Sequence, residues 1–249
     1  MERWSGRVAL VTGASAGIGA AIAKELVNHG MQVVGLARRD DKVKELAAQC
    51  ENAPGKLYAF QGDISKKEDV IAAFNWIKDN LGGVDVLVNN AGMMHESNLH
   101  DGEVEEWRQI LEVNVLGLSL CTREAVQSMR ERGVDDGYIV NISSVLGHII
   151  SGRDGIGMYN ASKHAVRVLS ESIRRELVSM GSRIRISSIS PGVVKTSFFD
   201  RNATLTPDKL FQEAHVLPED VVDAVIYVLS RPDRVQIQDM IIRATGTTY

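Results

Sequence analysis

Short apolar runs, rich in Val, Ile and Leu, alternate along the whole chain with longer stretches whose apolar residues recur every three or four positions. The runs have the length of β-strands and lack the apolar–polar alternation of a strand with one wet face. We therefore expect both faces of each strand to be buried. The predicted strands are Val8–Val11, Gln32–Leu36, Leu57–Phe60, Val84–Val88, Gly137–Ile142, Ile184–Ile189 and Val235–Ile242.

The stretches between these runs have the amphipathic pattern of helices. The predicted helices are Gly19–Asn28, Asp41–Gln49, Val70–Lys78, Glu103–Arg130, Tyr159–Val178 and Pro218–Leu229. Because strands joined by right-handed helical crossovers run parallel, the sequence predicts an α/β fold, a doubly wound Rossmann-type sheet of about seven parallel strands with helices on both faces. No linker divides the chain, so we expect residues 1–249 to form one domain.

Composition narrows the class of protein. Of the 249 residues, 44% are apolar and 24% charged, and 28 basic against 32 acidic residues give a net charge of −4, which argues against nucleic-acid binding. Two cysteines, Cys50 and Cys121, make no disulfide framework and fit a reducing compartment. No apolar run approaches about 18 residues and no secretory signal is present, so we expect a cytoplasmic protein without integral membrane association. The six histidines lack metal-ligand spacing, and we expect no metal.

A glycine-rich loop lies between the first predicted strand and the first predicted helix. Its glycines Gly13, Gly17 and Gly19 have the spacing G-x-x-x-G-x-G. Such glycines can serve only turns and packing, but a loop in this position, opening a helix N-terminus, is where a dinucleotide pyrophosphate binds. The predicted cradle is Gly13, Ser15, Ala16, Gly17, Ile18 and Gly19.

The end of the second strand bears on the choice between NAD and NADP. An acid there would bind the ribose 2′-hydroxyl and repel a 2′-phosphate. This chain instead has Arg38 and Arg39, and guanidinium groups suit a phosphate. Although solvated loop arginines are the alternative, the sequence predicts NADP(H) as the cofactor.

Tyr159 and Lys163 stand four residues apart in a predicted helix. They therefore share one face, with Cβ atoms about 5–6 Å apart. A nearby ammonium favours the phenolate and is expected to lower the pKa of the Tyr159 hydroxyl toward neutrality, which suits an acid/base group. By itself the pair also fits an ordinary solvated helix face.

Further motifs follow the strand ends in order: Asp63, Asn89-Asn90-Ala91-Gly92, Asn114, Ser144 and Pro191-Gly192. With the glycine-rich loop and the Tyr159–Lys163 pair, they make the chain resemble the short-chain dehydrogenase/reductases over essentially its full length. More narrowly, Cys121–Ala125, Val134–Gly137 and Val225–Ser230 are similar to the branch that holds insect NADP-dependent farnesol dehydrogenases and vertebrate ketosteroid reductases.

The resemblance implies a role for each motif. Tyr159 would be the general acid/base, Lys163 would lower its pKa and bind the nicotinamide ribose, and Ser144 would hold the substrate oxygen. Asn114 would keep a helix carbonyl and a water in place, or cap a bend in its helix. Further cofactor contacts would come from Asp63 and Ile64 at the adenine, Asn90, Ala91 and Gly92 at its ribose, and Pro191, Gly192, Val194 and Thr196 near the nicotinamide.

Some of these assignments have alternatives. Asp63 or Ser65 could cap the next helix, and Thr196 could cap a helix or contact the pyrophosphate. Ser143 competes with Ser144 for the substrate oxygen, because Tyr159 follows either serine at a longer interval than is usual in the family. The extra residues fall in a glycine-rich loop that can absorb them, and we assign the role to Ser144.

The predicted substrate pocket is apolar and adaptable. Its residues are Met93, Met94, His95, Ile149, Ile150, Phe198 and Phe199. The least regular stretch, near residues 195–216, is expected to form a small lid in which Phe198 and Phe199 close over substrate.

We therefore expect an oxidoreductase that interconverts a lipophilic alcohol and its carbonyl by direct hydride transfer. A farnesol-like isoprenoid alcohol is favoured, and a 3- or 17-ketosteroid or another carbonyl is the alternative. A non-catalytic NADP-binding scaffold would need the cradle but not Ser144, Tyr159 and Lys163 together. A nucleotide-sugar epimerase or dehydratase would need more chain after Val194. Because family members pair their long helices between subunits, a homodimer or homotetramer is expected.

Overall fold

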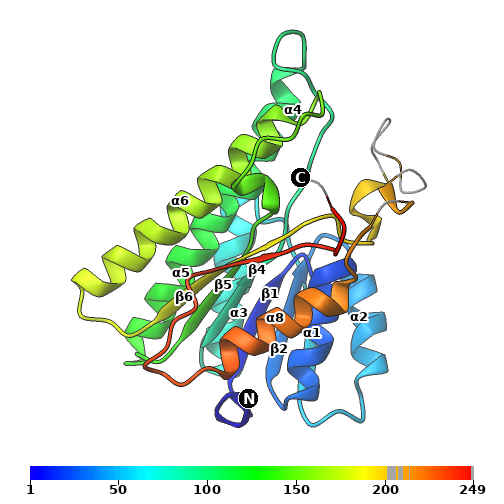
Figure 1. Ribbon diagram of the computed structural model, residues 1–249. Coiled ribbons are helices and arrows are strands. Elements are labelled where there is room, and N and C mark those ends of the chain that lie inside the picture. Colours follow the sequence, from blue (N-terminus) through cyan, green and yellow to red (C-terminus); the bar gives the residue numbers. More distant parts are fainter. Residues whose placement is uncertain (201–205, 207–209, 213, 248–249) are drawn as a thin grey trace.

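The computed structural model describes residues 1–200, 206, 210–212 and 214–247, and within them a sheet of seven parallel strands forms the centre of the molecule (Figure 1). The strand order is β3-β2-β1-β4-β5-β6-β7. The bounds are β1 Val8–Thr12, β2 Gln32–Ala37, β3 Lys56–Gln61, β4 Val86–Asn89, β5 Tyr138–Ile142, β6 Arg185–Pro191 and β7 Asp239–Ile242. The predicted doubly wound α/β fold is confirmed.

Helices cover both faces of the sheet (Figure 1). One layer holds α1 (Gly17–Asn28), α2 (Asp40–Gln49) and α8 (Pro218–Ser230), and the other holds α3 (Lys67–Leu81), α5 (Leu118–Glu131) and α6 (Gly157–Ser179). Along β1, Ala9 and Val11 pack with the first layer, whereas Val8 and Leu10 pack with the second. Alternate residues of a strand point to opposite faces, which explains why β1 is apolar over most of its length. The edge strands β3 and β7 are partly exposed, so the expectation of two buried faces is wrong for them.

The predicted long helix Glu103–Arg130 is divided. An α-helix, α4 (Val104–Leu111), leads into a wider π-helical turn, η2 (Glu112–Gly117), before α5 begins. The turn fits against the chain after β3, since a Cβ atom on Gly117 would lie 2.7 Å from the Ile64 carbonyl oxygen. Three short 3-10 helices complete the described elements: η1 (Glu2–Trp4), η3 (Val145–Gly147) and η4 (Ser197–Phe199).

Strand β7 is shorter than the predicted Val235–Ile242, because two carbonyl groups before it bond to side chains. The Arg185 guanidinium donates to the carbonyl oxygen of Val235 at 3.2 Å, and the Ser187 hydroxyl donates to that of Ile237. Regular pairing with β6 begins only at Asp239.

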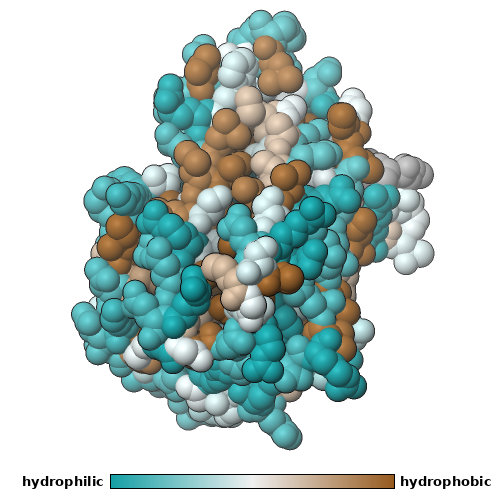
Figure 2. Space-filling view, turned by 90° about the vertical axis from the view of Figure 1, so that its left-hand side faces the viewer, coloured by the Kyte–Doolittle hydropathy of each residue, from teal (hydrophilic) through white to brown (hydrophobic). Residues whose placement is uncertain are grey.

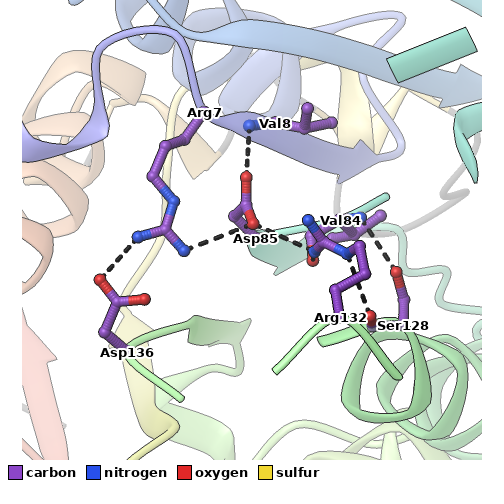
Figure 3. A network of polar contacts seen from close by, with 7 residues as sticks. All are labelled: Arg7, Val8, Val84, Asp85, Ser128, Arg132 and Asp136. Carbon is purple, nitrogen blue, oxygen red and sulfur yellow. Dashed lines mark hydrogen bonds and ion pairs between the residues drawn. The ribbon is translucent and has the colours of Figure 1, made fainter. Parts of the chain in front are cut away.

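A polar network joins the amino ends of β1, β4 and β5 (Figure 3). The Asp85 side chain, 8% exposed, accepts hydrogen bonds from Val8 N at 2.9 Å and Arg132 Nη2 at 3.0 Å, and forms an ion pair with Arg7 Nη2 at 3.3 Å. Arg7 also donates to Asp136 at 2.6 Å. Charged side chains therefore hold the amino ends of these strands together, which leaves the carboxyl ends available for a site.

Candidate active site

A cavity of about 1040 Å³ opens at the carboxyl ends of the strands. The strand order reverses at β1: β2 and β3 lie on one side of it, and β4 to β7 lie on the other. Ligands of doubly wound sheets bind in the crevice at such a reversal of strand order. The cavity is lined by the glycine-rich loop, by the segments after β2, β3, β4, β5 and β6, and by the start of α6.

The glycine-rich loop forms a cradle suited to an anion. Gly13 and Gly17 have φ of +68° and +54°, and a Cβ atom on Gly13 would lie 2.8 Å from Ala91 Cα. Helix α1 begins at Gly17 with no capping side chain and no acid in its first turn. Its N–H groups and positive dipole end therefore suit a phosphate. Ser15, Ala16 and Ile18 also line the cavity.

Gly19, predicted as part of the cradle, does not line the cavity. A Cβ atom there would lie 2.3 Å from Asn90 Nδ2 and 2.4 Å from the Gly13 carbonyl oxygen. The Asn90 amide donates to the carbonyl oxygens of Thr12 at 2.9 Å and Gly13 at 3.3 Å, and the Thr12 hydroxyl accepts from the N–H groups of Asn90 and Ala91. Gly19 thus makes room for a clamp that holds the loop. The sequence analysis missed Thr12, although its place directly before Gly13 was a signal.

The residues predicted to meet the adenine half of the cofactor all line the cavity: Arg38, Arg39, Asp63, Ile64, Asn90, Ala91 and Gly92. Asp63 Oδ1 accepts from the N–H and the hydroxyl of Ser65 at 3.0 and 2.8 Å. Helix α3 begins only at Lys67 and has no side-chain cap. The alternative in which Asp63 or Ser65 caps that helix is therefore wrong, because both side chains are used in a turn before it.

Tyr159 and Lys163 lie near the start of α6, and both side chains are buried. Lys163 Nζ lies over the tyrosine ring, 5.7 Å from its centroid, and donates to the Ile142 carbonyl oxygen at 3.0 Å. Burial raises the pKa of Tyr159 to about 12, against a lowering effect of its hydrogen bond with Ser144. Burial also lowers the pKa of Lys163 to about 8.

These pKa values correct the expectation of a lowered tyrosine pKa. The ammonium contacts the ring face and a carbonyl group, whereas the hydroxyl bonds to Ser144, so desolvation has the larger effect on both residues.

Both competing serines line the cavity, but their hydroxyl groups have different partners. The Ser144 side chain is hydrogen-bonded to Tyr159 and accepts from Leu146 N at 3.1 Å. The Ser143 hydroxyl donates to the Lys163 carbonyl oxygen at 3.3 Å. The geometry therefore favours Ser144 as the serine that meets a substrate oxygen.

Asn114 does not line the cavity and lies in the π-helical turn, 1% exposed. Its side chain accepts from Met93 N at 2.8 Å and donates to Met93 O at 2.9 Å and to Ser162 Oγ at 3.0 Å. Ser162 in turn donates to the Tyr159 carbonyl oxygen at 2.7 Å. Asn114 is thus a positioning residue that ties the loop after β4 to the helix of Tyr159, and Ser162 is a second link that the sequence analysis missed.

The segment after β6 closes the cavity between the cradle and Tyr159. Pro191, Gly192, Val194 and Thr196 line it. Thr196 Oγ1 accepts from Phe198 N at 3.3 Å and so caps η4, one of the two predicted alternatives. Its methyl group also lies against the cradle, since a Cβ atom on Gly17 would be 3.0 Å from it.

The other part of the cavity has a largely apolar wall. Aromatic rings follow one another from Tyr159 to Phe198, Phe199 and Phe211, with centroids 6.1, 5.3 and 6.4 Å apart. All the predicted pocket residues line it: Met93, Met94, His95, Ile149, Ile150, Phe198 and Phe199. Ile150 is 82% exposed and so lies at the rim. The sequence analysis missed Leu146, Ile156, Val193 and Leu210.

Much of the predicted lid near 195–216 falls outside the described residues, namely 201–205, 207–209 and 213. Across the described part of the chain, no helix is long and apolar enough to cross a membrane. Within the same part, no group of three or more His, Cys, Asp or Glu side chains could hold a metal ion.

Comparison with known proteins gives a consistent result. A family model described as short chain dehydrogenase matches residues 7–205. The chain is 47% identical to human "Dehydrogenase/reductase SDR family member 11", over 98% of this chain and 96% of that protein. It is 46% identical to "Farnesol dehydrogenase" of Aedes aegypti, over the full length of both. The resemblance stated from the motifs is confirmed.

Solved structures match as well. A closed form of serine dehydrogenase complexed with NADP+ has a TM-score of 0.88 at 30% identity and covers 97% of this chain and 96% of its own. An alcohol dehydrogenase of Thermococcus sibiricus complexed with 5-hydroxy-NADP has a TM-score of 0.85 at 26% identity, with 98% of both chains covered.

Proposed function

The chain belongs to the short-chain dehydrogenase family, and on that premise we propose that it is an NADP(H)-dependent oxidoreductase that interconverts a lipophilic alcohol and its carbonyl. The favoured substrate is a farnesol-like isoprenoid alcohol, which is supported by the full-length similarity to the Aedes aegypti enzyme. Reduction of a ketosteroid or another carbonyl is the second candidate, since the same reaction runs in both directions.

One observation carries this proposal. A single cavity is lined by the phosphate cradle, by Ser144, Tyr159 and Lys163, and by apolar side chains. A scaffold that only binds a dinucleotide would use the cradle but has no need of a buried tyrosine hydrogen-bonded to a serine beside an apolar wall.

Tyr159 is the group that moves a proton at the substrate oxygen. In oxidation its oxygen accepts the proton of the alcohol, and in reduction its hydroxyl gives that proton back. Ser144 Oγ bonds the same substrate oxygen and stabilises the charge that develops there. Lys163, whose Nζ lies 5.7 Å from the ring centroid, is the group that we propose binds the nicotinamide ribose. When bound in this cavity, a nicotinamide cofactor would supply the hydride acceptor or donor.

The preference for NADP(H) rests on Arg38 and Arg39, which line the cavity after β2, where an acid would repel a 2′-phosphate. Replacing Arg38→Ala should lower the ratio of kcat/KM with NADP+ to kcat/KM with NAD+. The matched control is Arg108→Ala on α4, whose side chain is 61% exposed and does not line the cavity. An unchanged ratio, or equal efficiency of the wild type with NAD+, would contradict the preference.

The function is tested by following NADPH absorbance with farnesol, geraniol, retinol, steroid and dicarbonyl panels. Tyr159→Phe should bind NADPH normally, because the ring is kept, yet lose turnover by about 10²- to 10⁴-fold. Retained turnover in this variant removes Tyr159 from the mechanism. A wild-type protein that binds NADPH and turns over no alcohol or carbonyl would favour the scaffold.

A homo-oligomer is part of the proposal. Figure 2 looks onto the side that carries α6 and shows apolar side chains gathered in patches between hydrophilic ones. Exposed apolar residues there and on the neighbouring helices include Leu116 at 63%, Val168 at 65% and Val178 at 63%. Light scattering that gives the mass of one chain would contradict a dimer or tetramer.

A further inference from the structure

His148 follows the short turn that carries Ser144 and precedes the lengthened loop to Tyr159. The turn is held on one side by α6. The Ser143 hydroxyl bonds the Lys163 carbonyl oxygen, and a Cβ atom on Gly147 would lie 2.7 Å from that same oxygen. The turn therefore has no freedom to move toward α6.

The His148 ring reaches in the other direction, toward β6 and β7. Its Nε2 atom lies 3.0 Å from Ser190 Oγ and 3.5 Å from Asp239 Oδ2. Asp239 also faces Arg167 on α6, at 3.7 Å. Ser190 is fully buried and directly precedes Pro191, which lines the cavity. The imidazole thus connects the serine turn to the strand that leads into the cofactor side of the site.

The chemistry of these partners defines the bond. A carboxylate only accepts hydrogen bonds, and the Ser190 hydroxyl can accept as well, so Nε2 is the nitrogen that carries the hydrogen in the neutral ring. A side chain with an N–H donor at a similar reach, such as Gln, can replace it, whereas Phe fills the space without a donor.

We propose that His148 is a positioning residue, whose hydrogen bond to Ser190, beside Asp239, fixes the turn of Ser144 relative to Tyr159 and sets where Ile149 enters the substrate pocket. The inference rests on the proposed oxidoreductase function. It goes beyond that function by naming a residue that holds the start of the lengthened loop between Ser144 and Tyr159 in place. After His148 the chain passes through Ile149 and the exposed Ile150 into a segment with two glycines, Gly152 and Gly155.

The test compares four variants: His148→Phe, His148→Gln, Ser190→Ala and the double variant His148→Phe/Ser190→Ala. A displacement of about 1 Å at a reacting group can cost up to 100-fold in rate, so we expect His148→Phe to lower kcat/KM for the alcohol by about tenfold or more, with kcat lowered by the displaced Ser144 and KM raised by the displaced Ile149. Its Kd for NADPH should stay unchanged. His148→Gln should retain activity within about threefold, and the double variant should lose little more than the worse single variant.

The matched control is His29→Phe. His29 follows the last residue of α1 and pairs with Glu25, a helix length of about 18 Å from the cradle, so its kinetics should equal those of the wild type. Wild-type kinetics in His148→Phe would overturn the proposal, as would equal losses in His148→Phe and His148→Gln. If His148→Phe does not fold, Ser190→Ala decides, and wild-type kinetics in that variant would overturn the proposal.

Amide hydrogen exchange separates this inference from the function itself. The N–H groups of His148 and Ile149 bond the Val145 carbonyl oxygen at 2.9 and 3.1 Å. They should exchange faster in His148→Phe than in the wild type, with or without turnover. If the wild type is inactive and His148→Phe shows this faster exchange, the proposed function is wrong and the positioning role of His148 stands. If the wild type is active and exchange in the variant is unchanged, the positioning role is wrong and the proposed function stands.

Discussion

Removing the Asp85 carboxylate should lower the free energy of unfolding without changing the candidate active site. This side chain is 8% exposed and accepts a hydrogen bond from the N–H group of Val8 in β1. It also bonds the guanidinium groups of Arg7, just before β1, and of Arg132, just after α5 (Figure 3). In Asp85→Ala, Arg7 keeps Asp136 as a partner, but Arg132 loses its carboxylate and Val8 N loses its acceptor.

Removing one partner of a buried ion pair costs about 3–5 kcal/mol of unfolding free energy. The two arginine side chains are 21% and 29% exposed, so water relieves part of this cost, and we expect about 3 kcal/mol. For a chain of this length, that corresponds to a fall in Tm of about 6–12 °C.

The matched control is Asp135→Ala. Asp135 also accepts three hydrogen bonds, one from Ser182 and two from Arg183, but its side chain is 43% exposed. Its loss should cost less than about 1 kcal/mol. Differential scanning calorimetry measures both variants, and NADPH affinity at 20 °C should be unchanged in each. Equal Tm values for the two variants, or a shift below about 3 °C in Asp85→Ala, would refute the argument from burial.

Three further outcomes are expected. Gly19→Ala places a Cβ atom 2.3 Å from Asn90 Nδ2, so it should displace the clamp and weaken NADPH binding about tenfold, measured by fluorescence titration; unchanged affinity would contradict the packing role. Burial lowers the pKa of Lys163 to about 8 from 10.5, so between these pH values the unfolded chain binds more protons than the folded one and this group makes stability rise with pH. Lys163→Met should therefore flatten the rise of Tm with pH in that window, and an unaltered slope would contradict the lowered pKa. Ser144→Ala should lose turnover while Ser143→Ala keeps most of it, and the opposite result in steady-state assays would reverse the assignment.

The sequence predicted the sheet well because central strands such as β1 and β4 are buried on both faces, which leaves few other arrangements. The cradle was predictable for a local reason, since Gly13 and Gly17 adopt backbone conformations that favour glycine. These features depend on residues close together in the chain.

Other features depend on contacts between residues far apart in the sequence, which a local sequence pattern does not reveal. The start of β7 is set by Arg185 and Ser187 of the neighbouring strand, and the role of Gly19 is set by Asn90, which lies far along the chain. The pKa of Tyr159 follows from how deeply its own side chain is buried. The spacing of Tyr159 and Lys163 placed them together but could not show that the ammonium meets the ring face.

The π-helical turn at Glu112–Gly117 makes the length of a helix part of the site. A π turn holds one residue more than an α turn, and each helical residue advances about 100° around the axis. Deleting one residue within the turn would let α4 and α5 join as a regular helix, with better local hydrogen bonding. Asn114 would then be rotated relative to Met93 and Ser162, the two groups that it now connects. A one-residue deletion that improves this helix would thus undo the link between the loop after β4 and Tyr159, so the number of residues in the turn matters to this link as well as their identity.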